Sequence, residues 1–330
     1  MKILQTVKKI PGGLMVVPLL LGILINTFFP QVLNIGGLTT ALWGSGAAST
    51  GIAITCFCVG TQINIRQAGE VLKRGSVLLL AKFAAGASIG ILIGYVFGLG
   101  GVLGISALAI VSAVTNSNGG LFISLCGTYG DSEDVGAQSL LAVNDGPFLT
   151  MIAFGASGLA DIPLINLVAA VLPVVVGMIL GNLDRDIADY LEPGSSILIP
   201  FFAFCLGAGI SVENLFAGGL EGIILGILCV GWSGLFCILA DRFINRRPGY
   251  AGAAVASAAG NCVATPALIA AAAPEMAPYV ERASVQCASA VVVSVILVPI
   301  LTAWVVKKWG DGKSRERKKV RISESCEAEV

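Results

Sequence analysis

The chain has 330 residues, of which 56% are hydrophobic and only 12% are charged, and its mean hydropathy is +0.89. Soluble domains contain about 25% charged residues, so this composition excludes an ordinary soluble protein and indicates an all-α polytopic membrane protein in a lipid bilayer. The formal net charge is zero and histidine is absent, which gives no sign of a nucleic-acid partner and removes the usual general base.

Apolar segments predict about ten transmembrane helices, because a helix needs about 20 residues to cross the hydrocarbon core. The first follows a basic start but has no small-residue cleavage site, so we expect a helix rather than a cleaved signal peptide. The segments lie at about residues 11–29, 43–63, 76–98, 103–129, 135–158, 165–182, 195–212, 219–240, 250–273 and 281–306.

Lysine and arginine predict the orientation, because cytoplasmic loops carry an excess of them. With the N-terminus inside, all of these residues except Lys82 and Arg282 fall at inner ends or in the tail. We therefore expect a multi-pass protein of the bacterial inner membrane with both termini in the cytoplasm. Residues 309–330 are polar and densely charged, which predicts a disordered cytoplasmic tail.

Two of the apolar segments are interrupted by polar and helix-breaking residues. Thr115–Gly120 reads TNSNGG, and Ala258–Pro266 reads AAGNCVATP. Non-helical backbone at membrane depth survives only where it is buried in protein or lines a wet cavity. Two such interruptions, in corresponding places of two halves, point to the binding site of a secondary transporter.

Short motifs recur in the same order in both halves of the chain. Val17–Gly22 resembles Leu172–Gly177, Phe57–Asn64 resembles Phe204–Ser211, and Asn116 corresponds to Asn261. These matches predict a five-helix repeat at residues 1–160 and a second at 161–308. Because five is odd, the second copy would enter the membrane from the opposite side, which makes an inverted repeat with two broken, crossing helices.

Polar side chains inside the predicted spans are candidates for substrate binding, because polar groups are costly there. A half-helix that begins near Gly119 would direct its positive N-terminal end at an anion. A purely structural kink would need only Gly and Pro, so we favour a binding role for the amides and hydroxyls. The predicted substrate site contains Asn116, Ser117, Asn118, Gly119, Asn261 and Thr265, with Gln62 and Gln286 as weaker candidates.

Two charged residues lie well inside predicted spans, whereas Glu221, Glu281 and Arg282 lie near span ends. Asp145, next to Asn144, is the deepest carboxylate, and we expect the two to couple transport to an ion; a permanent structural pairing is the alternative. Lys82 either pairs with Asp145 or a substrate carboxylate in the cavity, or extends to the membrane interface. The nine cysteines mostly lie in apolar runs without CxxC spacing, so we expect packing roles and no metal or cofactor.

Several stretches, in order, resemble the bacterial 2-keto-3-deoxygluconate permeases. They are Lys9–Gly22 (KIPGGLMVVPLLLG), Thr115–Leu121, Gly181–Asp184, Ile199–Phe204 and Ala264–Pro266, and the likeness runs from about Lys9 to Lys307. The resemblance implies an inner-membrane symporter that imports this sugar acid with protons, in a fold related to sodium/bile-acid symporters. Asp145 stands where the family pattern has Glu, and Asn261 where some members have small residues, so the exact solute and coupling ion stay open.

The sequence therefore favours a secondary active transporter that imports a small sugar-acid anion with protons by alternating access. A sodium-coupled symporter of another organic anion is the alternative. A channel is a weaker hypothesis, because two inverted halves favour alternating access. An enzyme is disfavoured because no nucleophile–base pair is visible, and no ATP-binding GxxxxGK[ST] motif is present. Nothing in the sequence indicates an oligomeric state.

Overall fold

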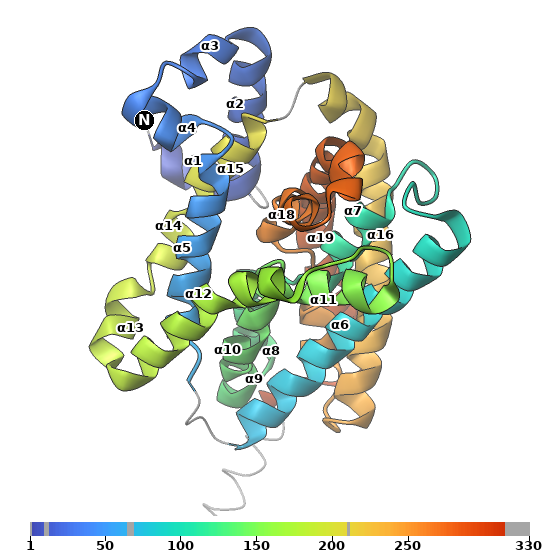
Figure 1. Ribbon diagram of the computed structural model, residues 1–330. Helices are drawn as coiled ribbons and strands as arrows, with labels where there is room; N and C mark the ends of the chain where they lie inside the picture. Colours follow the sequence, from blue (N-terminus) through green and yellow to red (C-terminus); the bar gives the residue numbers. More distant parts are fainter. Residues whose placement is uncertain (1, 10–12, 65–68, 210–211, 314–330) are drawn as a thin grey trace, which may run out of the picture.

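The computed structural model describes residues 2–9, 13–64, 69–209 and 212–313, and the regular secondary structure of these residues is helical (Figure 1). Of the predicted disordered tail at residues 309–330, residues 314–330 lie outside the described part. At its start, the last described helix ends at Trp309, and the Gly312 amide donates to the Tyr129 carbonyl at 2.8 Å. The first half contains α1 (Ile3–Lys9), α2 (Gly13–Phe28), α3 (Pro30–Leu33), α4 (Gly37–Trp43), α5 (Ala47–Thr61), α6 (Gly69–Phe97), α7 (Ala107–Thr115), α8 (Gly119–Tyr129), α9 (Ser132–Gly136), α10 (Gln138–Leu141), the 3-10 helix η1 (Ala142–Asp145) and α11 (Phe148–Ser157).

The second half follows a similar course. It contains α12 (Leu164–Leu183), α13 (Arg185–Leu191), α14 (Gly194–Ile197), α15 (Ile199–Gly207), α16 (Val212–Phe243), α17 (Tyr250–Ala254), η2 (Gly260–Val263), α18 (Thr265–Ala272), η3 (Pro274–Tyr279) and α19 (Val280–Trp309).

The helices form two groups that lie side by side (Figure 1). In the smaller group, α2 packs on α15 and α5 packs on α12 and α15. In the larger group, α16 packs on α19 and α6, and α6 packs on α7 and α11. Each group therefore combines helices from both halves of the chain. The groups meet where α11 contacts α12 and where α5 contacts η1.

Glycines bring the helices of the smaller group into close backbone contact. Gly22 and Gly207 lie between α2 and α15, and Gly60 and Gly177 lie between α5 and α12; a Cβ at any of the four would overlap backbone atoms of the facing helix. Gly22 matches Gly177 in the repeated motifs, and Gly60 matches Gly207. Each contact therefore joins one half of the chain to the other, and small residues allow the close approach that drives helix packing in lipid.

Among the residues that the structure describes, five helical segments are long and apolar enough to cross a membrane: Gly69–Phe97, Ala107–Tyr129, Leu164–Leu183, Gly219–Phe243 and Pro274–Trp309. Two bent pairs raise the number to seven if each is one span, namely Gly37–Trp43 with Ala47–Thr61 and Ser132–Asn144 with Phe148–Ser157, bent by 61° and 58°. The ten predicted spans also include α2, α14–α15 and α17–α18, which are too short or too interrupted for this criterion. An all-helical polytopic membrane protein is confirmed, whereas ten spans and inversion stay predictions.

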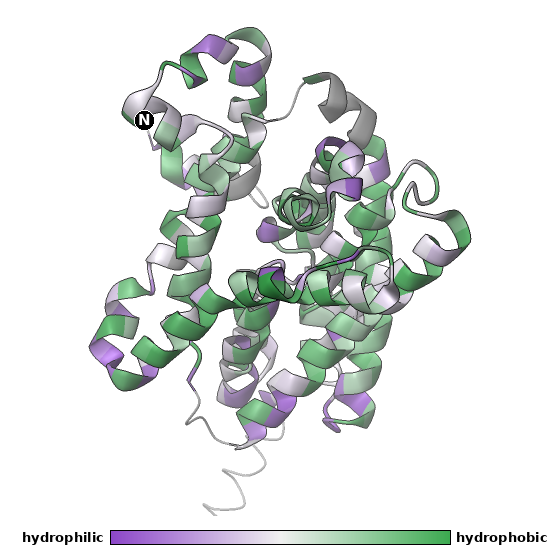
Figure 2. Cartoon of the chain, viewed as in Figure 1, coloured by the Kyte–Doolittle hydropathy of each residue, from purple (hydrophilic) through white to green (hydrophobic). Residues whose placement is uncertain are grey.

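The long helices consist mostly of hydrophobic residues (Figure 2), and many of their large apolar side chains are exposed. Leu80 and Leu92 on α6 are 64% and 53% exposed, and Ile227 on α16 is 56% exposed. Large apolar side chains in such numbers on the outside fit contact with lipid rather than water.

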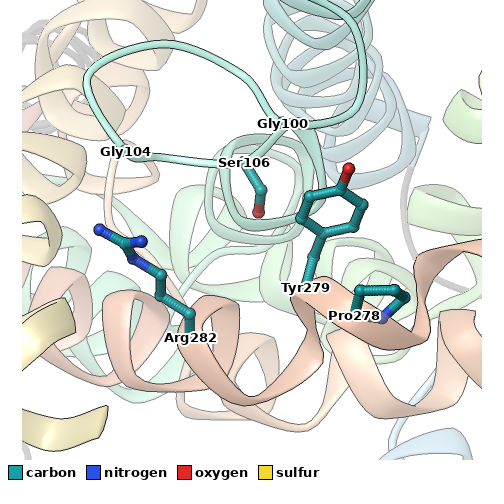
Figure 3. Close-up of a pocket in the computed structure, with 6 residues that line it drawn as sticks. All are labelled: Gly100, Gly104, Ser106, Pro278, Tyr279 and Arg282. Atoms are coloured by element: carbon teal, nitrogen blue, oxygen red, sulfur yellow. The ribbon is translucent and has the colours of Figure 1, made fainter.

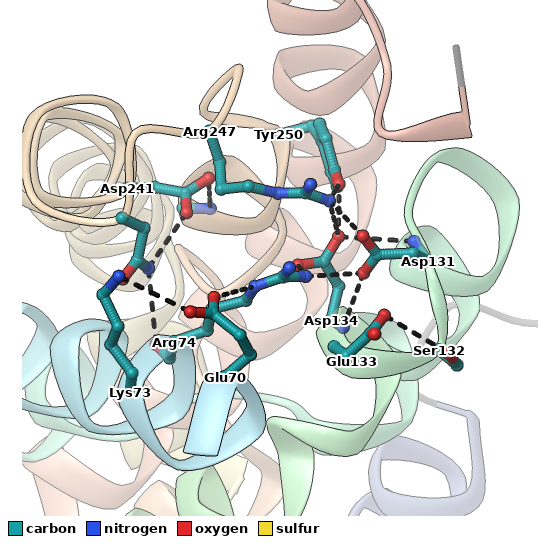
Figure 4. A network of polar contacts seen from close by, with 12 residues as sticks. Glu70, Lys73, Arg74, Asp131, Ser132, Glu133, Asp134, Asp241, Arg247 and Tyr250 are labelled. Atoms are coloured by element: carbon teal, nitrogen blue, oxygen red, sulfur yellow. Dashed lines mark hydrogen bonds and ion pairs between the residues drawn. The ribbon is translucent and has the colours of Figure 1, made fainter. Parts of the chain in front are cut away.

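A compact ion-pair network ties three helix ends together at the side that the charge bias predicts to be cytoplasmic (Figure 4). Arg74 of α6 contacts Asp131 and Asp134 at 2.6 and 2.8 Å. Arg247, before α17, contacts the same two carboxylates at 2.7 and 2.6 Å, and the Tyr250 hydroxyl donates to Asp134. Asp131 and Asp134 also form a capping box that starts α9.

Asp131 keeps its negative charge at neutral pH. Burial alone would raise the pKa of Asp131, but hydrogen bonds to Asp134 and the guanidinium groups of Arg247 and Arg74 hold it below the ordinary value of 3.8. Because the pKa of Asp131 is lower in the folded protein than in the unfolded chain, its ionisation stabilises the fold at pH values above the unfolded-state pKa. This contribution to stability is lost as the pH falls through the folded-state pKa.

We expect Asp134→Asn to lower the free energy of unfolding by roughly 3–5 kcal/mol, because it leaves the two buried guanidinium groups of Arg74 and Arg247 with a single carboxylate, Asp131. Asp134 is 2% exposed. Thermal unfolding of purified protein in detergent measures the loss.

Asp189→Asn is the matched control. Asp189 pairs with Arg185 at 3.1 Å, but both side chains are about 60% exposed, so this variant should cost no more than about 1 kcal/mol. Equal losses in the two variants would show that the network contributes no more than a surface ion pair.

Candidate functional site

The first break separates α7 from α8. Asn116, Ser117 and Asn118 are non-helical, and Asn116 and Asn118 are extended, with ψ values of 155° and 102°. The Asn118 side chain accepts a hydrogen bond from the Leu121 amide at 3.0 Å and so caps the new helix. Asparagine at this position, followed by two glycines, explains why the helix stops and restarts here.

The second break lies between α17 and α18. The chain leaves the helix after Ala254, passes through the short 3-10 helix η2 and becomes helical again at Thr265. Pro266 takes the second position of α18, where its missing N–H has no cost. Thr265 is buried, and its hydroxyl donates to the Asn261 carbonyl at 3.1 Å, so both predicted residues shape this break.

The two breaks meet at Ser257. The Asn118 amide donates to the Ser257 hydroxyl at 2.9 Å, so backbone freed in the first break is satisfied by the second. The Ser257 carbonyl accepts from Lys82 Nζ, also at 2.9 Å. Lys82 is fully buried, and its ammonium lies at this crossing rather than at the membrane interface.

Two hydroxyls from neighbouring helices also lie at the second break. Ser233 of α16 accepts from Lys82 at 2.9 Å, and Ser294 of α19 accepts from the Ala258 amide at 3.0 Å. Ser233, Ser257 and Ser294 are not among the residues predicted from the sequence. Serine is common in membrane helices. These three serines differ from others in being buried beside a break, and the sequence does not reveal that position.

Asn116 lies in a small buried polar cluster. Its Nδ2 donates to the Ser112 carbonyl at 2.8 Å, and Thr115 and Thr150 join their hydroxyls at 2.7 Å beside it. The Asn116 Oδ1 atom is buried and has no hydrogen-bond partner among the described residues. An unsatisfied buried acceptor is costly, so this oxygen is suited to a donor from a bound solute or water.

The coupling candidates lie next to this cluster. The Asn144 side chain places Nδ2 3.0 Å and Oδ1 3.1 Å from the Ser117 hydroxyl, which joins η1 to the first break. Asp145 is the last residue of η1, and its side chain is outside the described part of the structure. A Cβ on Gly146 would lie 3.4 Å from Cys56 of α5, so this turn is where the two helix groups meet.

Two predicted residues lie away from the crossing. Gln62 follows α5, and its amide donates to the Ala188 carbonyl at 2.7 Å, which fastens α5 to α13 in the smaller group. Gln286 of α19 donates to the Gly104 carbonyl and to Glu221 at 2.9 and 2.5 Å. Both are polar residues near helix ends, and the sequence could not show which neighbours they meet.

A pocket of about 270 Å³ opens near Gln286 (Figure 3). Arg282, Tyr279 and the Ser106 hydroxyl surround it. Arg282 pairs with Glu221, which also accepts from Gln286, and Ser106 caps the start of α7. The pocket is therefore at the opposite end of α7 from the break.

Known proteins match nearly the whole chain. The family described as 2-keto-3-deoxygluconate permease matches residues 4–311. A 2-keto-3-deoxygluconate permease 1 of Salmonella typhimurium is 49% identical over 317 residues, covering 96% of this chain and 99% of the relative. The 2-keto-3-deoxygluconate permeases of Xanthomonas axonopodis pv. citri and Bacillus subtilis are 41% and 40% identical, covering 95% and 96% of this chain and 100% and 97% of the relatives.

We expect Asn116→Ala to weaken binding of 2-keto-3-deoxygluconate, the solute named for these relatives, by about tenfold, because one hydrogen-bonding group is lost. The protein should still fold, with a loss of stability of roughly 1–3 kcal/mol. Ligand-induced thermal shift on purified protein measures both quantities.

Asn182→Ala provides the control. Asn182 also donates to the carbonyl four residues earlier, Met178, at 2.7 Å, but it lies on α12 in the other helix group. It should lose similar stability and keep ligand affinity. If both variants bind the ligand equally well, Asn116 does not contact the solute.

Proposed function

Because this chain belongs to the 2-keto-3-deoxygluconate permease family, we propose that it is a secondary active transporter that imports this sugar acid or a close analogue across the bacterial inner membrane. The relatives are named permeases, so the chain is a transporter and not an enzyme. One observation carries the assignment to a site: two interrupted helices meet at buried polar groups that include the unpaired Asn116 Oδ1.

The solute would bind beside the first break, where the two helix groups meet. Its hydroxyls would donate to Asn116 Oδ1, and its carboxylate would face the N-terminal end of α8, which attracts an anion. Asn116 and Ser117 are fully buried in this conformation. A solute therefore reaches them only if the two groups shift, which is the motion that alternating access requires.

The proposed arrangement of the chain is a pair of inverted five-helix repeats, at residues 1–160 and 161–308. The glycine contacts support it. Gly22 contacts the helix that carries Gly207, and its counterpart Gly177 contacts the helix that carries Gly60, the counterpart of Gly207. Both halves also contribute to both helix groups. A pseudo-two-fold axis in the membrane plane would produce this exchange.

Purified protein in liposomes should exchange labelled 2-keto-3-deoxygluconate for the unlabelled solute inside. An inward proton gradient should drive accumulation that saturates and that unlabelled sugar acid competes away. Sugar acids that differ at single hydroxyls would define the specificity. If the folded protein exchanged none of these sugar acids, the proposal would be contradicted.

Proton coupling is assigned to Asp145, beside the Asn144–Ser117 contact. We expect Asp145→Asn to abolish accumulation driven by a proton gradient while exchange persists in part, because the neutral amide cannot carry the proton. Uptake and exchange are measured in the same vesicles, with Asp161→Asn, an exposed carboxylate after α11, as the control. If Asp145→Asn still concentrates the solute, Asp145 is structural and another group carries the ion.

A further inference from the structure

Lys82 is a buried cation held by neutral partners. Its ammonium donates to Ser233 Oγ and to the Ser257 carbonyl, both at 2.9 Å, and lies 3.9 Å from Cys229 Sγ. Among the side chains that the structure describes, no carboxylate lies within ion-pair distance of it. A buried charge of this kind costs several kcal/mol unless strong interactions offset it, so its position at the crossing requires a reason.

The oxygens around Lys82 are of the type that binds a monovalent cation. The Ser257 carbonyl belongs to the non-helical stretch of the second break, and the Ser233 hydroxyl donates to the Cys229 carbonyl at 2.6 Å, which turns its lone pairs toward Nζ. Unwound carbonyls and hydroxyls at a broken helix are the ligands that coordinate a sodium ion in membrane transporters.

We propose that the Lys82 ammonium is a tethered cation that occupies a monovalent-cation site at the crossing and replaces a bound sodium ion there. Ser257 links this charge to the first break, because its hydroxyl accepts from the Asn118 amide at 2.9 Å. The tethered charge thus holds both breaks together without any ion from solution. This inference rests on the broken-helix site of the proposed function, but not on the identity of its solute.

Removal of the side chain should convert the site into one that binds a free ion. Lys82→Ala leaves the oxygens in place and opens a cavity, so sodium should raise its melting temperature by roughly 2–4 °C relative to choline at equal ionic strength. The wild type should show no difference between sodium and choline. Thermal unfolding of purified protein in detergent, without substrate, measures these shifts.

Two further variants separate a site from a general salt effect. Lys82→Met fills the same space with a neutral chain and should not respond to sodium. Ser233→Ala in the Lys82→Ala background removes one ligand and should abolish the response. A sodium-specific shift of equal size in all three variants would overturn the proposal, as would its absence in Lys82→Ala.

If Lys82→Ala does not fold, measurements on the wild type test whether the protein needs a free sodium ion. Exchange of labelled solute in liposomes should run at the same rate in sodium and choline media, and the melting temperature should not change between them. A sodium requirement in either measurement would overturn the inference. Failure to transport this sugar acid would contradict only the proposed function, because the melting-temperature test uses no substrate.

Discussion

The structure depends on one constraint: backbone groups freed where a helix breaks inside the membrane need partners within the protein. At the crossing, each break provides partners for the other or recruits them from neighbouring helices. The Asn118 amide is satisfied by Ser257, and the Ser257 carbonyl by Lys82. The long helices α6, α16 and α19 therefore do more than enclose the site, because they carry the side chains without which the breaks would be unstable.

The same constraint explains how much of the site was predictable from the sequence. Asparagine, glycine and proline interrupt long apolar runs, so both breaks could be located within a few residues. The partners could not be found this way, since Ser233 and Ser294 look like any serine in a membrane helix. Lys82 shows the limit of prediction from the sequence. It lies about two turns from the predicted helix end, so its ammonium group could equally have reached the membrane interface or the crossing of the two breaks.

The fold was predictable to a similar degree. Apolar runs indicated an all-helical membrane protein. The repeated motifs contain the glycines that bring α2 to α15 and α5 to α12, but only the structure shows these contacts. The number of spans stays a prediction, because the break predicted at Ala258–Pro266 leaves only the short helices α17 and α18 there, and hydropathy does not show whether they cross the membrane as one unit. Gln62 is a related case, since a polar residue at a helix end can bind solute or, as here, fasten a neighbouring helix.

The contacts within and between the two helix groups differ in kind, which bears on the motion that the proposed alternating access needs. Within the larger group, breaks, hydroxyls and the Arg74–Asp134 network link the helices through buried polar bonds, which favour one arrangement. Between the groups, α5 contacts η1 and α11 contacts α12, and Gly146 lies beside Cys56. A contact such as that at Cys56 is not directional, so a shift there would break few specific bonds. Because Ser117 and Asn144 lie next to this seam, a shift of one group against the other would expose the polar cluster and leave the crossing intact.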